Sequence, residues 1–588
     1  MRTLLGYQDI EIIMTKTQSA SNMERRDTGP SYIGRCHTGP WHIRRWSGLS
    51  FLLLLSGLAA CAVQDKLTND AAAVDPASSI RDHVTWLAAD ERAGREAGTP
   101  GYDAAAEYVA DQFRTLGVAP GNGDSYFQTV NLRTTVRDNA AAAFTLTHAD
   151  GSTVSLTNRT DYLSGGNTAG TAYEVVGDLV FVGHGIVGGG YDHYADLDVN
   201  GKIVVAFNGA PTDLNSEVRA HLGSAATKAR LAASRGARGL ILMSASTRNP
   251  EENWQRAIAR GDRTRWGWVG PDGQTSRGDF PPAFQMGPTG AALLFDGSAQ
   301  SFDAVRNAAN EQTVDTPLRG FDLQKRGQLR GGGVIDDMQS ANVVGLIEGV
   351  DPALRDEIVV LSAHLDHVGT HEPRRGGDDF IHNGALDNAM GVATLLDVAR
   401  RFQVEGRPKR SVMLLAVTAE EKGLIGSDYF AHFPAVPLDR LVATVNLDMP
   451  LVLYPFTDVI AFGADRSTLG PMVRAAGEKA GVALIDDPYP NLSLFVRSDH
   501  YSFVKKGVPS VFLFLGTGNG GKAVFEDFMA TKYHSPSDDV MLDIQWEEAA
   551  RFAALNYQIA AEIADAPAKP QWQAGDFFAA AAGVETAR

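Results

Sequence analysis

Acidic and imidazole side chains follow three apolar runs in the middle of this chain. The runs read EIVVLSA, SVMLLAVTA and LVATVN, and the side chains behind them are His364, Asp366, Glu420, Glu421 and Asp448. Continuous apolar runs of this length are typical of strands buried on both faces of a sheet. Because functional groups in open α/β sheets gather at the carboxyl ends of the strands, we expect these five side chains to lie close together.

This set of side chains predicts a metal-dependent hydrolytic site. Buried carboxylates repel one another and lose their hydration, so they require a cation. Histidine with carboxylate is the ligand set expected for zinc, and two cations ~3.5–4 Å apart need one ligand between them. Asp387 is the predicted bridge, because the small residues Ala389 and Gly391 let its turn come close. His534, in YHSPSDD, completes the ligands of this two-metal site.

The elements that must position these groups alternate between strand and helix. Helices are expected at 79–89, 102–116, 386–402, 424–433, 467–480 and 545–563. The apolar runs lie between the later helices of this series. This order predicts an α/β fold with a mixed, mostly parallel sheet sandwiched by helices.

A second pattern, of short strand-like runs, fills the chain from about residue 140 to 316 and predicts an inserted β-rich unit. Its pieces GDLVFVGHGI, DLDVNGKIVV and LAASRGARGLILM resemble the protease-associated (PA) domain, an insert found in several peptidase families. An unrelated β-rich domain is the alternative. The predicted parts are a leader (1–60), a tether (61–78), the first part of the catalytic domain (79–139), the insert (140–318), the main catalytic part (319–566) and a tail (567–588).

The amino-terminal region has the pattern of an export signal. Arg44 and Arg45 precede an apolar stretch, 49–58, which is too short to cross the ~30 Å hydrocarbon core of a bilayer as a helix. The sequence LAAC that ends at Cys61 resembles the lipobox of bacterial lipoproteins, whose cysteine is acylated. The resemblance implies an exported protein anchored by lipid on Cys61, in the outer membrane facing the periplasm. An ordinary signal peptide with a chance cysteine is the alternative.

The overall composition narrows the range of partners. The formal net charge of −17 argues against a nucleic-acid surface, because phosphate binding needs a basic face. The two cysteines, Cys36 and Cys61, can form neither a disulfide framework nor a cysteine-based zinc site. No feature of the sequence predicts an oligomeric state.

The site residues resemble, in their order, those of the M28 family of zinc metallopeptidases. The series is His364, Asp387, Glu420-Glu421, Asp448 and His534, and the earlier segment LAADERAGREAGTPGYDAAAEYVADQF also matches. The resemblance covers most of residues 79–565, and within the family it favours the aminopeptidases that carry a PA insert.

The resemblance implies a role for each site residue. His364 and Asp448 would bind one zinc, Glu421 and His534 the other, and Asp387 both. Glu420 would be the general base, and Asp366 would hold the ring of His364. Tyr533 matches a position where some relatives have a tyrosine that assists the reaction; the alternative is that it only packs.

The implied function is an aminopeptidase that hydrolyses the N-terminal bond of peptides with two zinc ions. Two alternatives use the same scaffold: a single-zinc acyltransferase similar to glutaminyl cyclase, and a non-catalytic binding protein. The presence of both Asp387 and Glu421 favours two metals, and non-catalytic relatives lose ligands that this chain retains. The choice of amino- over carboxypeptidase depends on the resemblance alone.

Overall fold

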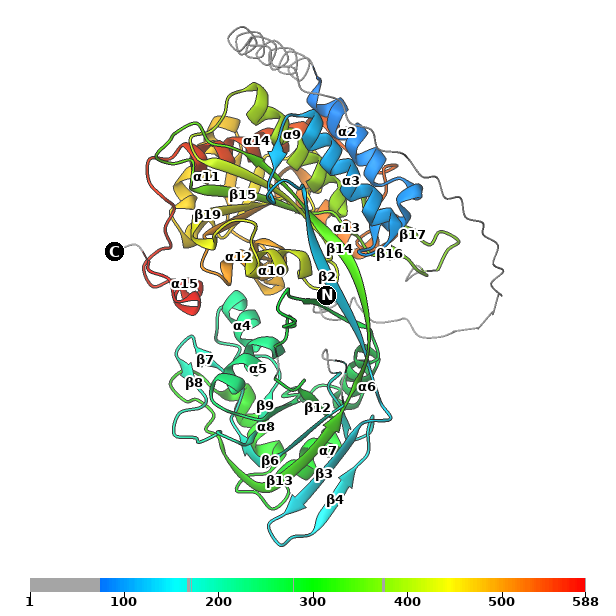
Figure 1. The fold of residues 1–588 in the computed structure, drawn as a ribbon. Coiled ribbons are helices and arrows are strands. Elements are labelled where there is room, and N and C mark those ends of the chain that lie inside the picture. The colour runs from blue at the N-terminus through cyan, green and yellow to red at the C-terminus, as the bar shows by residue number, and fades with distance from the viewer. Residues whose placement is uncertain (1–73, 167–169, 171, 279, 373–375, 587–588) are drawn as a thin grey trace, which may run out of the picture.

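A computed structural model describes residues 74–166, 170, 172–278, 280–372 and 376–586 (Figure 1). The predicted leader and Cys61 lie outside these residues, as does most of the tether. Within the described part of the chain, no helix combines the length and the apolar character that crossing a membrane requires.

The larger of two main sheets carries the candidate site. In spatial order its strands are β11 (Arg265–Val269), β2 (Phe127–Arg137), β14 (Gly333–Ile347), β18 (Ser411–Val417), β15 (Ile358–His364), β19 (Leu441–Asn446), β22 (Ser510–Leu515), β20 (Asp458–Phe462) and β21 (Ala483–Ile485), with β1 (Ala119–Pro120) paired to β14. The four strands from β18 to β22 are parallel neighbours. Antiparallel pairs flank them, between β14 and β18 and between β20 and β22. The predicted mixed α/β sheet is therefore confirmed, with its parallel part at the centre.

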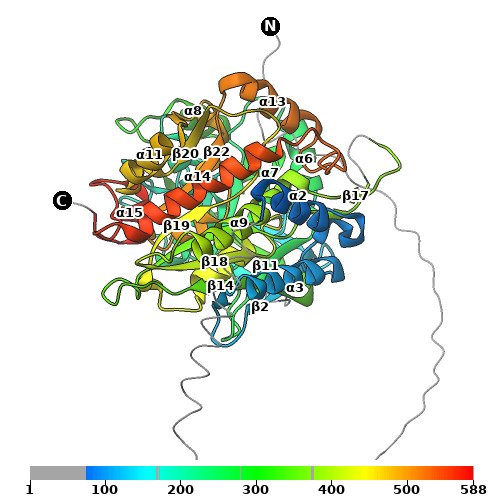
Figure 2. The ribbon, with the colours of Figure 1, turned by 90° about the horizontal axis from the view of Figure 1, so that it is seen from above.

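Helices cover both faces of this sheet, which explains why the central strands are buried along their whole length. One face is covered by α2 (Pro76–Leu87), α3 (Pro100–Thr115), α9 (Met390–Val404), α11 (Leu469–Ala480) and α14 (Trp546–Asp565). The other face is covered by α10 (Ile425–His432) and α12 (His500–Val504). Figure 2 shows α2, α3, α9 and α14 lying across the sheet.

The amphipathic patterns predicted these helices well. In α2 the apolar side chains Ile80, Val84 and Leu87, spaced four and three residues apart, are fully buried. Asp75 caps the helix by accepting a hydrogen bond from the backbone N–H of Ser78 at 3.1 Å. The local pattern thus predicts which side of this helix is buried, while the cap at Asp75 places its start three residues before the predicted one at 79.

A second sheet forms the β-rich unit. Its order is β4 (Thr153–Leu156), β3 (Ala143–His148), β13 (Phe321–Gly331), β6 (Tyr173–Phe181), β9 (Ile203–Phe207), β10 (Gly239–Met243), β12 (Phe284–Met286) and β5 (Tyr162–Leu163). Its helices are α4 (Ser216–Gly223), α5 (Ala225–Ser234), α6 (Pro250–Gly261), α7 (Pro288–Phe295) and α8 (Phe302–Glu311).

Two antiparallel pairs of strands stand apart from both main sheets. They are β7 (Val187–Gly188) with β8 (Tyr191–Asp192), and β16 (Gly369–Thr370) with β17 (Ile381–His382). The remaining helices are α13 (Gly521–Thr531) and α15 (Phe577–Ala582).

The predicted limits of the insert need two corrections. Residues 321–331 form β13, so they belong to the second sheet and not to the catalytic part predicted from 319. Conversely, β11 comes from within the insert but pairs with β2 in the larger sheet. Strand partners are chosen by contacts distant in sequence, which local patterns do not reveal. The predicted tail also packs, because α15 buries Phe578 and Ala579.

The two units are joined by a long antiparallel ribbon. The strands β2 and β14 pair continuously, from Phe127 opposite Val343 to Arg137 opposite Gly333. Figure 1 shows this pair running from the larger unit into the smaller one. The indole Nε1 of Trp268 in β11 donates to Oδ2 of Asp428 in α10 at 2.8 Å. The strand β11, which the insert contributes to the larger sheet, is thus fastened to the face of that sheet that bears α10 and α12.

Candidate metal centre

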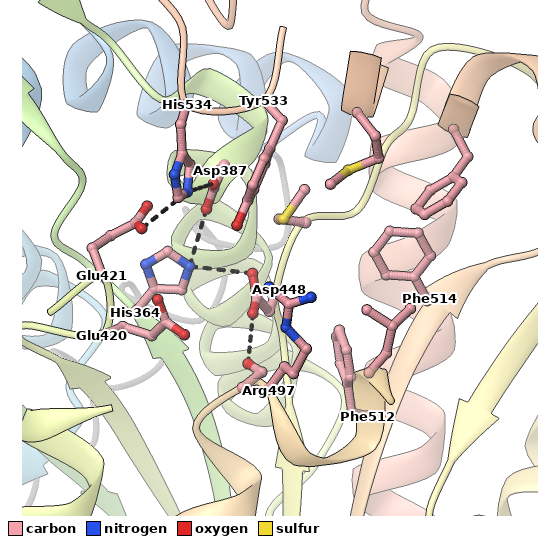
Figure 3. Close-up of a pocket in the computed structure, with 15 residues that line it drawn as sticks. His364, Asp387, Glu420, Glu421, Asp448, Arg497, Phe512, Phe514, Tyr533 and His534 are labelled. Atoms are coloured by element: carbon pink, nitrogen blue, oxygen red, sulfur yellow. Dashed lines mark hydrogen bonds and ion pairs between the residues drawn. The ribbon is translucent and has the colours of Figure 1, made fainter. Parts of the chain in front are cut away.

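Three predicted ligands meet where β15 and β19 end. His364 is the last residue of β15, and Asp448 follows β19 by two residues. Nε2 of His364 lies 3.2 Å from Oδ1 of Asp387 and 3.2 Å from Oδ1 of Asp448. These side chains point toward one another in Figure 3. They form a group that could hold one cation.

A second group shares Asp387 with the first. Nε2 of His534 lies 2.9 Å from Oε2 of Glu421 and 3.3 Å from Oδ2 of Asp387. Asp387 therefore turns one oxygen to each group, which is the arrangement that a bridging ligand requires. The structure brings all five predicted ligands together, although they come from segments separated by up to 170 positions.

Several donor atoms of this centre have the surroundings expected of metal ligands and not of hydrogen-bonded groups. Oδ2 of Asp387, Oε1 of Glu421 and Nε2 of His534 are buried and have no hydrogen-bond partner among the described residues. Leaving buried polar atoms unpaired is costly, by about 1–3 kcal/mol each. Nitrogen and oxygen donors at such separations suit zinc, so a cation between them would satisfy all three atoms at once.

The charges of the centre also indicate that it requires a cation. Burial lowers the pKa of His534, but the negative charges of Glu421 and Asp387 outweigh it and raise that pKa to about 10. Burial raises the pKa of Glu421, but His534 and its neighbours outweigh it and hold that pKa well below its usual range. The carboxylate of Glu421 thus stays ionised and requires a positive partner, which is either a proton on imidazole or a metal ion.

Glu420 lies beside the ligands without joining either group. It follows β18, and its carboxyl lines the same pocket as His364 and Asp448. Burial raises the pKa of Glu420 well above its usual range, and the positive charge of His364 only partly opposes this. A carboxyl group of this kind can hold a proton near neutral pH, as a general acid and base must.

Asp366 supports the centre by a different contact from the one predicted. Its carboxylate accepts hydrogen bonds from the backbone N–H of Glu420 at 2.9 Å and of Glu421 at 3.3 Å. The ring of His364 interacts instead with the backbone carbonyl of Asp366, with Nδ1 at 3.1 Å from the oxygen. This contact turns Nε2 toward the carboxylates. The carboxylate of Asp366 therefore orients both glutamates through their backbone N–H groups. The backbone carbonyl group of Asp366 orients the ring of His364.

Asp387 projects from an irregular turn, and not from the helix predicted to begin at residue 386. The backbone of Asp387, with φ −116° and ψ 86°, leaves the helical region, and α9 begins only at Met390. The predicted role of Gly391 holds here: a Cβ at this position would lie 2.1 Å from Oδ1 of Asn388 and 2.6 Å from the carbonyl oxygen of Leu447. The turn can therefore press against the end of β19.

Three residues that hold the centre together escaped the sequence analysis. The carboxylate of Asp538 accepts from the backbone N–H groups of Leu386 and Asp387, both at 2.9 Å, and so fixes the turn. Arg95 is buried and donates to carbonyl oxygens of Leu87, Leu365, Asn383 and Gly384 at 2.6–3.0 Å. The third is His367, which lies against Glu421. The nearest signal was position: Asp538 and His367 are four and three residues beyond predicted ligands.

An apolar wall faces the centre across a pocket of about 540 Å³. Its side chains are Met449, Leu494, Phe512, Phe514, Phe525, Met529 and Tyr533. Tyr533 extends into the pocket and stacks on His534 with ring centroids 3.8 Å apart (Figure 3). Arg497 and Ser498 also line it, and the hydroxyl of Ser498 donates to Oδ2 of Asp448 at 2.5 Å. Such a pocket combines an acidic end with an apolar side.

Comparison with known proteins finds aminopeptidases and a zinc protease. A probable leucine aminopeptidase 2 of Aspergillus oryzae is 30% identical over 186 residues, which is 30% of this chain and 33% of that protein. A probable zinc metalloprotease of Pyrenophora teres is 30% identical over 116 residues, 20% of this chain and 24% of that protein. The chain thus spans a third or less of the length of these two relatives.

A solved aminopeptidase from Aneurinibacillus sp. strain AM-1 is 19% identical, with a TM-score of 0.44 over 86% of this chain and 98% of that one. The family model described as peptidase family M28 matches residues 342–560. This segment runs from β14 into α14 and contains every predicted metal ligand. Residues 342–560, and with them the whole candidate centre, are thus similar to peptidase family M28.

Proposed function

We propose that the protein is an aminopeptidase that hydrolyses the N-terminal bond of peptides with two zinc ions. The observation that carries the proposal is the pair of donor groups that share Asp387, with Glu420 at their side. The names of the relatives, leucine aminopeptidase and zinc metalloprotease, support the same activity.

Each cation has its own set of proposed ligands. His364 and Asp448 would hold one zinc, Glu421 and His534 the other, and Asp387 both. Bound zinc would supply Lewis acidity, which favours the ionisation of water near neutral pH and polarises a carbonyl group. The protein's own part is to fix these donors, chiefly through Asp366 and Asp538.

Glu420 is the residue placed to move the proton. Its carboxylate would take a proton from the attacking water and deliver it to the nitrogen of the leaving amine. The hydrogen bond from its backbone N–H to Asp366 holds it in position at the end of β18. Tyr533, which lines the pocket, is proposed to assist by donating a hydrogen bond to the oxyanion as it forms.

The pocket suits the free N-terminal residue of a peptide. The carboxylates of the centre complement a positively charged α-amino group, while the wall of Phe512, Phe514 and Phe525 complements an apolar side chain. The β-rich unit, proposed to be a PA-type insert, packs on this side: the hydroxyl of Ser493 donates to the carbonyl oxygen of Ser216 in α4 at 3.1 Å. We infer that it restricts entry to short peptides.

A panel of substrates tests this proposal. Leucine and phenylalanine amides are expected to be cleaved with kcat/KM about 10²-fold above the aspartate amide, because the apolar wall cannot pair a buried charge. N-acetylated peptides should be inert, and short peptides should be cleaved in preference to folded proteins. Chelator should abolish release of the first residue, and added zinc should restore it.

The alternatives give different results in the same panel. A cyclase would convert N-terminal glutamine to a product that has lost ammonia, without releasing an amino acid, and would need one zinc per chain. A binding protein would hold the peptides without changing their mass. Equal cleavage of folded proteins and dipeptides would contradict the role proposed for the insert.

The predicted anchor on Cys61 has its own test. We propose that the protein is exported and held by acyl chains on Cys61, since two or more chains give stable anchoring. In a bacterial host, the full-length protein should sediment with the membranes, whereas Cys61→Ser should be recovered in the soluble fraction. Sedimentation of both forms alike would argue against the anchor.

A further inference from the structure

His367 is a buried histidine at the centre that the five predicted ligands do not include. It lies three residues beyond His364 and is fully buried. Its backbone N–H donates to the carbonyl oxygen of Arg95 at 3.2 Å, which fixes the start of the loop after β15. Its side chain therefore has a defined place in the site.

The ring of His367 approaches the same carboxylates as His534. Its Nδ1 lies 2.8 Å from Oε1 of Glu421 and 3.9 Å from Oδ2 of Asp387. His534 faces the other oxygen of Glu421, and the two imidazole planes stand at 79° to each other. Glu421 thus lies between two histidines, each also directed at Asp387.

A hydrogen bond from His367 to Glu421 is the simplest alternative, and the geometry opposes it. The separation of 2.8 Å is short enough, yet neither Nδ1 of His367 nor Oε1 of Glu421 makes a hydrogen bond within the described residues. The ring N–H direction therefore misses the oxygen. Donor atoms that are close but not aimed at one another are expected when all of them are aimed at one ion.

The separations fit a single tetrahedral ion. With zinc–ligand distances of about 2.0–2.2 Å, donor atoms around one tetrahedral zinc lie roughly 3.3 Å apart. The four histidine-to-carboxylate separations given above run from 2.8 to 3.9 Å, with His367 measured to Oε1 of Glu421 and His534 to Oε2. His367, Asp387 and Glu421 alone already form a group able to hold a cation.

We propose that His367 is a fourth protein ligand of the cation held by Asp387, Glu421 and His534. This inference rests on the two-metal site of the proposed function. It makes the two cations unequal: one would have four protein ligands, the other only His364, Asp387 and Asp448. Four protein ligands close a zinc site, whereas three leave a position open for reaction. Ligands of both cations line the pocket, and of the four ligands proposed for the closed site only His367 lies outside this lining.

Metal binding and X-ray absorption test the proposal directly. With zinc bound to the full chain, the absorption fine structure should report three imidazoles for two zinc ions. In His367→Gln and His367→Phe it should report two, and titration with a chelator should show that one of the two ions is held at least 10²-fold more weakly. His382→Gln is the matched control, because His382 is also buried but stacks on His371 and belongs to neither group of donors.

The outcomes separate this inference from the proposed function. Two imidazoles in the wild-type protein, unchanged in both variants, would overturn the role of His367 while leaving the two-metal site intact. A wild-type chain that binds no zinc would overturn the proposed function itself. Having two variants guards against misfolding of one, since circular dichroism identifies which of them is folded.

Discussion

Glu420→Gln is expected to fold, to bind zinc as the wild type does, and to lose about 10²–10⁴-fold in kcat. The carboxamide has nearly the shape of the carboxyl group, and the backbone N–H that donates to Asp366 is unchanged. What disappears is the group that accepts a proton from water. The measurement is kcat on leucine amide, with metal content determined on the same sample.

Glu96→Gln provides a matched control for this variant. Glu96 is also a partly buried glutamate near the site, but it pairs with Lys422 at 2.7 Å and contacts no predicted ligand. It should keep activity within a few-fold of the wild type. Full activity in Glu420→Gln would remove Glu420 as the base, and loss of zinc from that variant would assign it a binding role instead.

Asp387→Ala should weaken both zinc sites at once, because this one carboxylate serves both groups of donors. Groups that only orient a ligand change metal affinity by about 10–100-fold, so removing a shared ligand is expected to cost more than 10²-fold at each site. Peptidase activity should fall as zinc is lost. Metal content after dialysis against a weak chelator is the measurement.

Asp397→Ala separates this effect from general damage to the fold. Asp397 is buried in α9, close in sequence to Asp387, and its carboxylate pairs with Arg400 at 2.8 Å and Arg401 at 2.7 Å. Its loss should lower the melting temperature but leave two zinc ions bound. A variant at Asp387 that retained both ions at wild-type affinity would show that the carboxylate does not bridge them.

The positions of the site residues could be predicted because they depend on local pattern. Glu420 and Asp448 follow apolar runs whose burial on both faces leaves little choice but a central strand, and parallel neighbours bring the ends of such strands to one edge. The extents of α2 and α14 could be predicted to within three residues for a similar reason, since the amphipathic period lies within the helix itself.

The contacts that orient these residues could not be predicted in the same way. Arg95 reaches carbonyl groups up to 289 positions away, and Asp538 holds a turn 151 positions before it. Neither partner leaves a trace in the local sequence. The start of the helix was misplaced at residue 386 because the apolar period of α9 continues through the turn at Asp387, while the backbone N–H groups that donate to Asp538 select a non-helical backbone. His367 lies three residues beyond a predicted ligand, but no local pattern indicates that its ring approaches Glu421.

The ribbon of β2 and β14 has a mechanical consequence. The first and last crossings of the chain between the two sheets, in β2 and β14, are paired with each other from Phe127 opposite Val343 to Arg137 opposite Gly333, so they flex together as one strip and not as two independent tethers. The hold of β11 on β2, and of Trp268 on Asp428, braces this strip at its base. Any tilting of the smaller body is therefore transmitted to α10 and to the end of β18, where Glu420 stands.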